Sequence, residues 1–383
     1  MAYQNVGTPR FYIDQAEYLK SIGFDFESEI QNSEYNDVYK DAMINGGMAY
    51  GSQYHSTVSN PELFNLDPTN QKLVEYAGTA SGASSYNFIC PTGYNSNNLE
   101  GDNVGRYFAL LNHNIETPFH FRWIQGNSAI LNTEKIDILN GYPFEKGCTI
   151  YELEKTPSDD GNSFNPLNGY NLTNIIINRG TGVTEEPKLG GISWGVYYDM
   201  PNSPDLDLTL DIEFTGAKSV DTLGGSTLTN TRYTGSPWWY DVDGNKVEPW
   251  SIGETTGTSK RNGRRVWKLS FSYISDENLF ASNFMSNNYL ENSADNSGYN
   301  SNDMVLDSNN HPTEFEYTLE DDNSFIAQVL NKVSNGQRFI FQPDNTNNNP
   351  DQFAICMLDM TTFSIKQVAF KTYEIEMDIR EVW

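Results

Sequence analysis

Residues 373–383 read Tyr-Glu-Ile-Glu-Met-Asp-Ile-Arg-Glu-Val-Trp, and this is the strongest structural signal in the chain. Bulky apolar side chains alternate with polar ones, which is typical of a strand that buries one face. Earlier stretches of the last third show the same alternation, at residues 265–273, 339–341 and 353–358. We therefore expect this part of the chain to be mostly β-sheet.

Helical spacing occurs in only a few places. Residues 322–333 read Asp-Asn-Ser-Phe-Ile-Ala-Gln-Val-Leu-Asn-Lys-Val, so apolar residues follow a plausible capping sequence at helical intervals. Near the N terminus, residues 7–14 predict a turn and a short apolar strand, and residues 15–22 predict a brief helix that ends at Gly23. The expected fold class is all-β with one or two short helices.

The order of these elements resembles a known architecture. Over roughly the last third of the chain, strand, helix, strand, Pro-Asp-Asn loop and final strand resemble the split β-barrel of phage tail-tip proteins, namely the distal tail proteins and the lambda-type minor tail protein M. The resemblance carries no active-site motif and implies a ring-forming structural part of a virion tail. In these families an early strand pairs with the C-terminal one. By that analogy, residues 1–30 join residues 189–383 in one split-barrel unit with long polar loops.

A second resemblance concerns four separate segments. They look like segments shared by uncharacterised structural proteins of marine bacteriophages, and they cover residues 192–206, 224–230, 263–276 and 342–352. This likeness implies a virion component and gives no mechanism.

The middle of the chain predicts a second β module. Short strand candidates separated by Gly, Asn and Pro turns fit a β-sandwich, at residues 86–90, 107–113, 119–124, 148–153 and 174–178. Residues 105–114, Gly-Arg-Tyr-Phe-Ala-Leu-Leu-Asn-His-Asn, are similar to a strand of galactose-binding-like jelly rolls in phage tail proteins. The resemblance implies an inserted jelly-roll sandwich over residues 31–188, with residues 181–191 as the return linker.

Length and composition agree with a two-module β-protein. A chain of 383 residues exceeds the size at which one core keeps growing, and aromatic residues reach 13% of it. The formal charge of −27 argues against a surface that grips nucleic acid, because such binding needs clustered Lys and Arg. We therefore expect no nucleic-acid partner.

The cysteines and the N terminus bear on the compartment. Cys90, Cys148 and Cys356 are an odd number without metal-type spacing, so we interpret them as buried thiols in a reducing cytoplasm. The N terminus has no basic and apolar signal pattern, and no run approaches membrane-spanning length. We expect assembly in the host cytoplasm, a final place in the virion tail and no membrane insertion.

Clustered aromatic residues suggest a glycan platform. Sugar rings stack on exposed aromatic faces, and the candidates here are Trp238, Trp239, Tyr240 and Trp250. Such residues also plug into a core or anchor a subunit interface, and we favour interface anchoring.

The same region contains oxygen ligands that suit Ca²⁺, namely Asp241, Asp243, Asn245 and Glu248. The spacing lacks the distal glutamate of a full calcium loop, and Asp243-Gly-Asn245 between two valines is a strong hairpin turn. We favour the hairpin, and calcium remains the alternative. No other cofactor is expected.

Enzymatic motifs are not apparent. There is neither a Gly-x-Ser-x-Gly elbow nor a cysteine-protease motif, so nucleophilic hydrolysis is unsupported. His113 and His120, with Glu116 between them, are interpreted as polar strand ends rather than zinc ligands. Glycoside hydrolysis by two carboxylates stays open, because their separations are not readable from sequence. We expect no enzyme activity.

One basic cluster stands out in the acidic chain, at residues 260–265. Its arginines could pair with an acidic loop, residues 303–322, of a neighbouring copy, and a solvated turn explains them equally well. The interface candidates are Arg261, Arg264, Arg265 and Trp383. Residues 282–322 and 344–350 are polar and are expected to be loops.

These observations predict a non-enzymatic bacteriophage structural protein, as a distal-tail or tail-adaptor component. The expected partners are further copies in a ring, for which a hexamer is one arrangement, other phage tail proteins and host surface glycans. The alternatives are a host-glycan receptor-binding tail protein and a capsid decoration protein.

Overall fold

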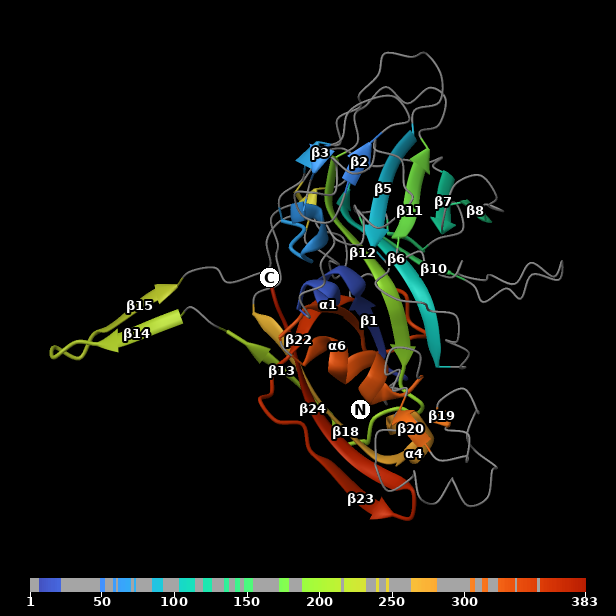
Figure 1. Ribbon diagram of the computed structural model, residues 1–383. Helices are drawn as coiled ribbons and strands as arrows, with labels where there is room; N and C mark the ends of the chain where they lie inside the picture. Colours follow the sequence, from blue (N-terminus) through green and yellow to red (C-terminus); the bar gives the residue numbers. More distant parts are fainter. Residues whose placement is uncertain are drawn as a thin grey trace.

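The computed structural model describes part of the chain, in separate segments. The described residues are 7–21, 49–51, 58–59, 61–69, 72–73, 85–91, 103–113, 120–125, 134–137, 142–144, 148–153, 172–178, 188–214, 217–231, 239–240, 246–247, 263–280, 304–306, 312–315, 323–334, 336–349 and 352–383. Every strand pairing within them is antiparallel, and the helices are short (Figure 1). The prediction of a mostly β fold is confirmed.

A 12-stranded sheet forms the body of the protein. Its main path runs β13 (Thr209–Glu213), β18 (Arg264–Ser275), β24 (Thr372–Glu381), β22 (Ala354–Leu358), β21 (Phe339–Gln342), β1 (Arg10–Asp14), β12 (Lys188–Asp199), β6 (Val104–His113), β10 (Cys148–Leu153) and β9 (Tyr142–Phe144). Two further strands join it beside this path: β23 (Ile365–Ala369) pairs with β24, and β4 (Lys72–Leu73) pairs with β12. Strands from both ends and from the middle of the chain therefore share one sheet.

The N-terminal strand has two neighbours from distant parts of the chain. Phe11 lies opposite Tyr198 of β12 on one side and opposite Phe341 of β21 on the other. The tail-tip resemblance implied a pairing with the C-terminal strand. Instead, β1 lies between β12 and β21, and β24 pairs with β18, β22 and β23.

Strand β12 begins inside the segment that we predicted as a linker. Lys188–Gly191 belong to the strand, and β6 pairs along it, with Leu110 opposite Ile192. The two glycines looked like a break, but they allow close packing. A Cβ on Gly190 would lie 2.5 Å from the carbonyl oxygen of Pro68. Strands on both sides of the boundary predicted at residues 188/189 thus form one hydrogen-bonded sheet.

A second sheet has six strands, all from the region predicted as a sandwich: β3 (Val58–Ser59), β2 (Ala49–Gly51), β5 (Ser85–Pro91), β11 (Leu172–Asn178), β7 (His120–Gln125) and β8 (Glu134–Asp137). Three two-stranded hairpins complete the strands: β14 (Ala217–Asp221) with β15 (Thr227–Thr231), β16 (Trp239–Tyr240) with β17 (Lys246–Val247), and β19 (Met304–Leu306) with β20 (Pro312–Phe315). The last hairpin lies in residues 282–322, which we predicted as loop only. Residues 344–349 contain no helix or strand, as expected of a loop.

The helical elements are few. They are α1 (Gln15–Ser21), η1 (Pro61–Phe64), α4 (Asp276–Leu279), the π-helical turn η3 (Ile326–Leu330) and α6 (Asn331–Val333). The helix predicted over 322–333 is thus present as η3 and α6. All of its residues except the half-buried Asn331 are buried, and even Gln328 and Lys332 are 0% and 1% exposed.

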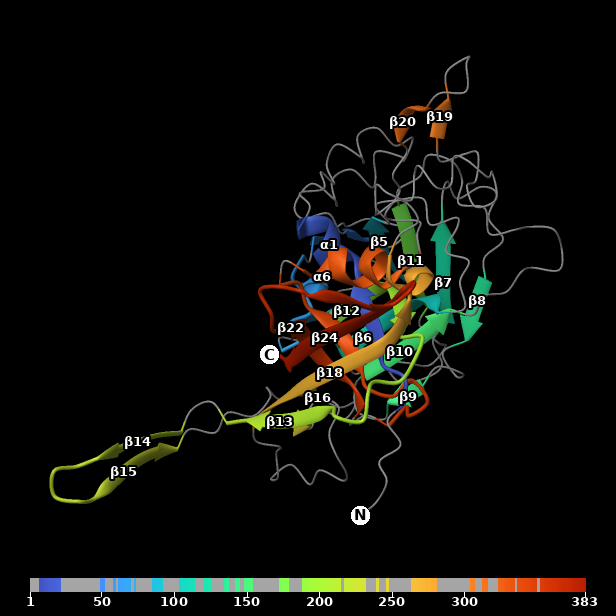
Figure 2. The same cartoon turned by 90° about the horizontal axis from the view of Figure 1, so that it is seen from below.

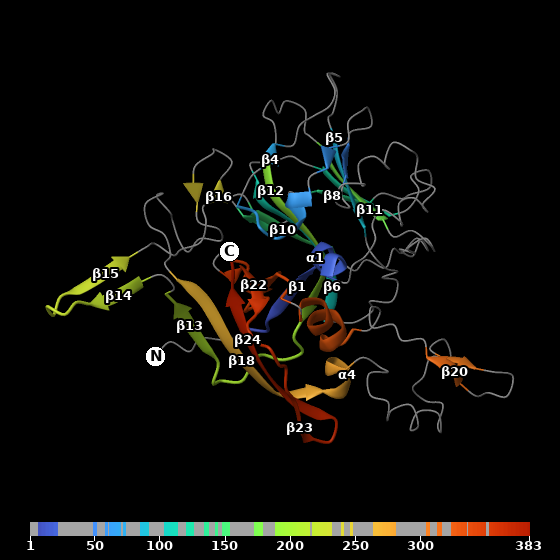
Figure 3. The ribbon, with the colours of Figure 1, turned by 60° about the vertical axis from the view of Figure 1, so that its left-hand side comes forward.

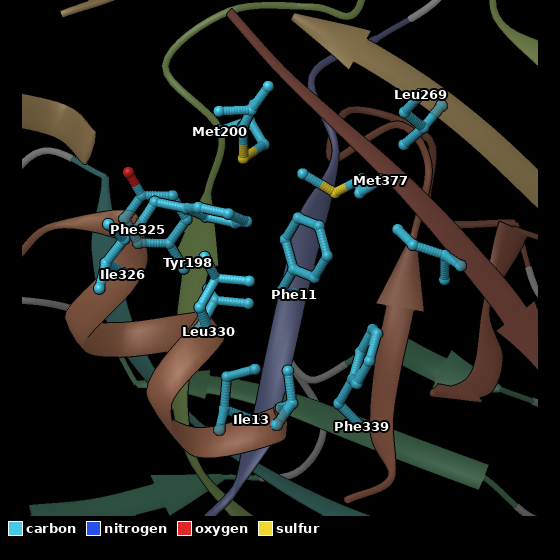
Figure 4. Close-up of a cluster of buried hydrophobic side chains, with 14 of the residues drawn as sticks. Phe11, Ile13, Tyr198, Met200, Leu269, Phe325, Ile326, Leu330, Phe339 and Met377 are labelled. Atoms are coloured by element: carbon cyan, nitrogen blue, oxygen red, sulfur yellow. The ribbon is translucent and has the colours of Figure 1, made fainter. Parts of the chain in front are cut away.

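Side chains on the two faces of the sheet form two cores. In the first, Phe11 lies 5.8 Å from Phe325 and 5.3 Å from Phe341, measured between ring centroids, and the η3 helix covers this face (Figure 4). In the second, Tyr12 lies 5.0 Å from Tyr107. Strands β1 and β21 are therefore buried on both faces, which explains their continuous burial.

Candidate interaction surface

Of the four residues of the predicted aromatic platform, only Trp239 has a described side chain, and it is buried. Trp239 is 2% exposed and belongs to the second core, with Tyr107 and Ile150. Trp239 is therefore corrected from a glycan-stacking residue to a core residue. Tyr240 lies in β16, but its side chain, Trp238 and Trp250 lie outside the described residues.

The hairpin predicted next to this platform is confirmed. Trp239 lies opposite Val247, and Tyr240 lies opposite Lys246. The oxygen ligands considered for calcium, Asp241, Asp243, Asn245 and Glu248, lie outside the described residues. Among the residues that the structure does describe, no group of three or more His, Cys, Asp or Glu is arranged to hold a metal ion.

Arg265, predicted at a subunit interface, is engaged inside the chain. Its guanidinium forms an ion pair with Glu381, with Nη2 3.0 Å from Oε1, and donates to the carbonyl oxygen of Phe353 at 2.8 Å. Arg265 is buried because it has the same strand parity as Trp267, so its side chain points to the covered face. The interface prediction is therefore wrong for Arg265.

The other interface candidates differ from Arg265. Arg264 has the opposite parity, and its guanidinium carbon lies 4.8 Å above the ring of Trp383. Both side chains are partly exposed, and Arg261 lies outside the described residues. Arg264 and Trp383 remain candidates that are stacked on each other.

The histidines take up strand ends, as predicted. His113 is the last residue of β6, and His120 is the first residue of β7. His113 is buried, and burial lowers its pKa from 6.5 to about 4. It is therefore neutral at pH 7. Cys356 is a free thiol in the first core, whereas the side chains of Cys90 and Cys148 lie outside the described residues.

Sequence reasoning missed a buried chain of polar side chains. The Ser193 hydroxyl donates to the Asp14 carboxylate at 2.6 Å, and the hydroxyls of Ser193 and Tyr107 are 2.6 Å apart. Burial, together with the charge of Asp14, raises the pKa of Tyr107. Asp14 also accepts from the backbone N–H of Glu17 and so caps α1. Asp14, Ser193 and Tyr107 are each no more than 1% exposed. This hydrogen-bonded network therefore ties β1, β6 and β12 together and presents no reactive group to a substrate.

Exposed large apolar side chains gather in two places. One group lies on β13, the residues on either side of it and the β14–β15 hairpin, and comprises Leu206, Leu210, Ile212, Phe214, Val220, Leu223 and Leu228. The other comprises Tyr273, Val368 and Phe370. We call residues 205–214 the edge surface, residues 217–231 the arm, and Tyr273 with residues 365–371 the tip surface.

The edge surface is the end of the large sheet. On one side β13 pairs with β18, and no strand of the described residues pairs with its other side. Leu210 lies opposite Trp267, so it lies on the face that carries the first core, yet it is 50% exposed. The opposite face is charged, where Asp211 pairs with Lys268 and Glu213 pairs with Arg380. An uncovered apolar strip beside unpaired backbone groups is a template for another chain.

Comparisons of the chain with protein-family models, with curated proteins and with solved structures found no match. Within the described part of the chain, no helix combines the length and the apolar character needed to cross a membrane.

Proposed function

We propose that the protein is a non-enzymatic structural component of a bacteriophage virion, as a distal-tail or tail-adaptor part that assembles with further copies of itself. The observation that carries this proposal is the open end of the large sheet. Strand β13 and the residue after it expose Leu210, Ile212 and Phe214, by 50%, 40% and 63%, beside a backbone edge with which no strand of the described residues pairs. An edge of this kind favours association.

The sequence resemblance supplies the phage context. The strand, helix and strand order that resembles tail-tip proteins corresponds to β18, η3 with α6, β21, β22 and β24. These elements contribute most residues of the first core, so they form one packed unit. A rigid all-β unit with an open edge suits a ring component, because the exposed backbone groups of one copy can be paired by the next.

The role proposed here is binding and assembly rather than turnover. The polar chain of Asp14, Ser193 and Tyr107 is sealed from solvent, and His113 is held neutral inside the protein. These groups stabilise the fold and are inaccessible to a substrate. The proposal includes other tail proteins as neighbours and no nucleic-acid partner.

Locating the protein in purified particles tests the proposal. Antibody-labelled particles should carry label at the distal tail when viewed by electron microscopy. Label over the head would instead identify a capsid decoration protein. Binding of the full chain to host surface glycans, with particles unlabelled at the tail ring, would favour the receptor-binding alternative. Particles that lack the protein altogether would contradict a structural role.

A further inference from the structure

Strands β13 and β23 lie on opposite sides of the β18–β24 ribbon, whereas Tyr273 belongs to β18 itself and its carbonyl oxygen accepts from the side chain of Asn202 at 3.1 Å. Strand β13 pairs with β18 over Arg264–Lys268, on one side of the ribbon. Strand β23 pairs with β24 from Thr372 to Ile375, on the other side and at the other end. In Figure 1, β13 and the arm accordingly lie at the left of the molecule and β23 lies at the bottom. Strand β13 with the arm, and the β23–β24 turn, are thus two separate sites, while Tyr273 lies between them next to Ser272, which donates to Asp205.

The arm stands away from the body of the protein. Figures 2 and 3 show β14 and β15 projecting beyond the sheet, and they pair with no other strand of the described residues. Val220 lies opposite Leu228 on one face, and both are 63% exposed. The other face is polar, where Thr227 donates to Asp221 at 2.6 Å. A two-stranded hairpin is marginal by itself in water, so an apolar face of this kind needs a covering surface.

The tip surface is shaped by two irregularities. A bulge in β18 between Phe271 and Ile274 turns Tyr273 outward, and Tyr273 is 76% exposed. The turn between β23 and β24 places Phe370 at its tip with 86% exposure. The next residue, Lys371, has a φ of 53°, a conformation that such turns usually give to Gly or Asn. A large aromatic side chain is therefore held out on a short, well-defined turn.

The charges of the two surfaces are complementary. Residues 205–214 contain four acidic residues and no basic one. Asp211 and Glu213 are paired with Lys268 and Arg380 of the neighbouring strands, whereas Asp205 and Asp207 accept from serine hydroxyls. Residues 365–371 contain Lys366 and Lys371 and no acidic residue; Lys366 is paired with Glu374 of β24, so Lys371 is the cation offered to a second copy. In a chain with a net charge of −27, most contacts between copies are repulsive, so an acid-free segment is where a second copy is attracted.

We propose that the edge surface and arm of one copy bind the tip surface of a second copy, head to tail. The apolar face of the arm and Leu210 cover Phe370 and Tyr273, while the acidic edge segment faces Lys371. This inference rests on the proposed function, since it names the two surfaces through which the ring closes. Contact between unlike surfaces produces a ring or an open chain of copies. A two-fold dimer through the edge surface would instead bring two acidic segments together.

Two charge substitutions and one control test the proposal in the full chain. Leu228→Asp places a charge on the apolar face of the arm, and Phe370→Asp does the same at the tip. Thr229→Asp adds the same charge to the polar face of the arm and is the matched control. All three positions are exposed, so circular dichroism should show an unchanged melting curve. By mass photometry, the unaltered chain and the control should form the same assemblies of more than two copies, and both other variants should be monomeric.

Mixing the two monomeric variants separates unlike from like contacts. The Leu228→Asp variant keeps its tip surface, and the Phe370→Asp variant keeps its edge surface and arm. An equal mixture should therefore form dimers and nothing larger, because each dimer ends in two altered surfaces. Assembly of either variant alone, or a mixture that stays monomeric, would overturn the head-to-tail contact.

The proposed function is judged separately from this inference. If the unaltered chain assembles and both variants also assemble, the named surfaces are wrong while self-association stands. If the unaltered chain is monomeric, the inference fails. Labelling of purified particles then decides whether the protein is still a virion component.

Discussion

Ser193 donates a hydrogen bond of 2.6 Å to Asp14 across 179 residues of sequence, in a place that water does not reach. The same serine hydroxyl lies 2.6 Å from that of Tyr107. Three strands of the large sheet, β1, β12 and β6, are thus joined by side chains as well as by backbone hydrogen bonds.

Replacing Ser193 by Ala should therefore destabilise the protein. The change removes one partner each from the buried Asp14 carboxylate and the buried Tyr107 hydroxyl, which should cost about 2–3 kcal/mol. Ser270→Ala is the matched control, because its bond of 2.8 Å to Asp207 is exposed. Chemical denaturation should give a lower midpoint for the first variant and little change for the second. Equal losses of stability in the two variants would show that burial of the Ser193 hydrogen bonds does not increase their contribution.

The buried ion pair predicts a second large effect. Glu381→Gln leaves the Arg265 charge buried without its anionic partner, and the loss of stability should be about 3 kcal/mol. Glu374→Gln serves as the control, since its partner Lys366 has a side chain that is 74% exposed. The control should show no measurable change in thermal unfolding. A stable Glu381→Gln variant would mean that Arg265 finds other partners.

The pH dependence of stability should report His113. Folding favours the neutral form, since burial lowers the pKa from 6.5 to about 4. The contribution is complete above pH 6.5 and is lost as the pH falls toward 4, because the unfolded chain then binds the proton more readily. Between pH 7 and pH 5 the loss should be about 2 kcal/mol. His113→Gln should remove this part of the pH dependence, as measured by chemical denaturation of both proteins at pH 7 and at pH 5. An identical slope in the variant would contradict the assignment.

Gly195 is required by close packing between β12 and β1. A Cβ at this position would clash with the carbonyl oxygen of Ile13. Gly195→Ala should therefore reduce stability by about 2–4 kcal/mol, since backbone must move. At Gly224, in the turn of the arm, an added Cβ meets nothing within 4 Å, so Gly224→Ala should change the melting temperature little. Similar melting curves for both variants would show that the sheet adapts easily at Gly195.

Local patterns predicted many elements of this fold. The alternation in residues 373–383 corresponds to β24, and the helical spacing in 322–333 corresponds to η3 and α6. The N-terminal strand and helix correspond to β1 and α1. Such elements are readable because the side-chain period is a property of consecutive residues.

Partners of these elements were harder to predict. The sequence shows Arg265 as part of an exposed-looking basic cluster, but strand parity and the position of Glu381 make it a buried ion pair. Trp239 likewise belongs to an aromatic run and lies in the core. Both outcomes depend on residues more than 100 positions away, which periodicity does not reveal.

The sequence by itself determined that this chain forms amphipathic strands with few helices, because alternation, turn residues and capping residues act locally. Only the tertiary structure decided that β1 lies between β12 and β21, that β6 extends the same sheet, and that β13 ends it with its apolar side uncovered. Residues 205–214 alternate like any half-buried strand. Whether such a strand is covered or open depends on its neighbours in the sheet, and these neighbours come from distant parts of the chain.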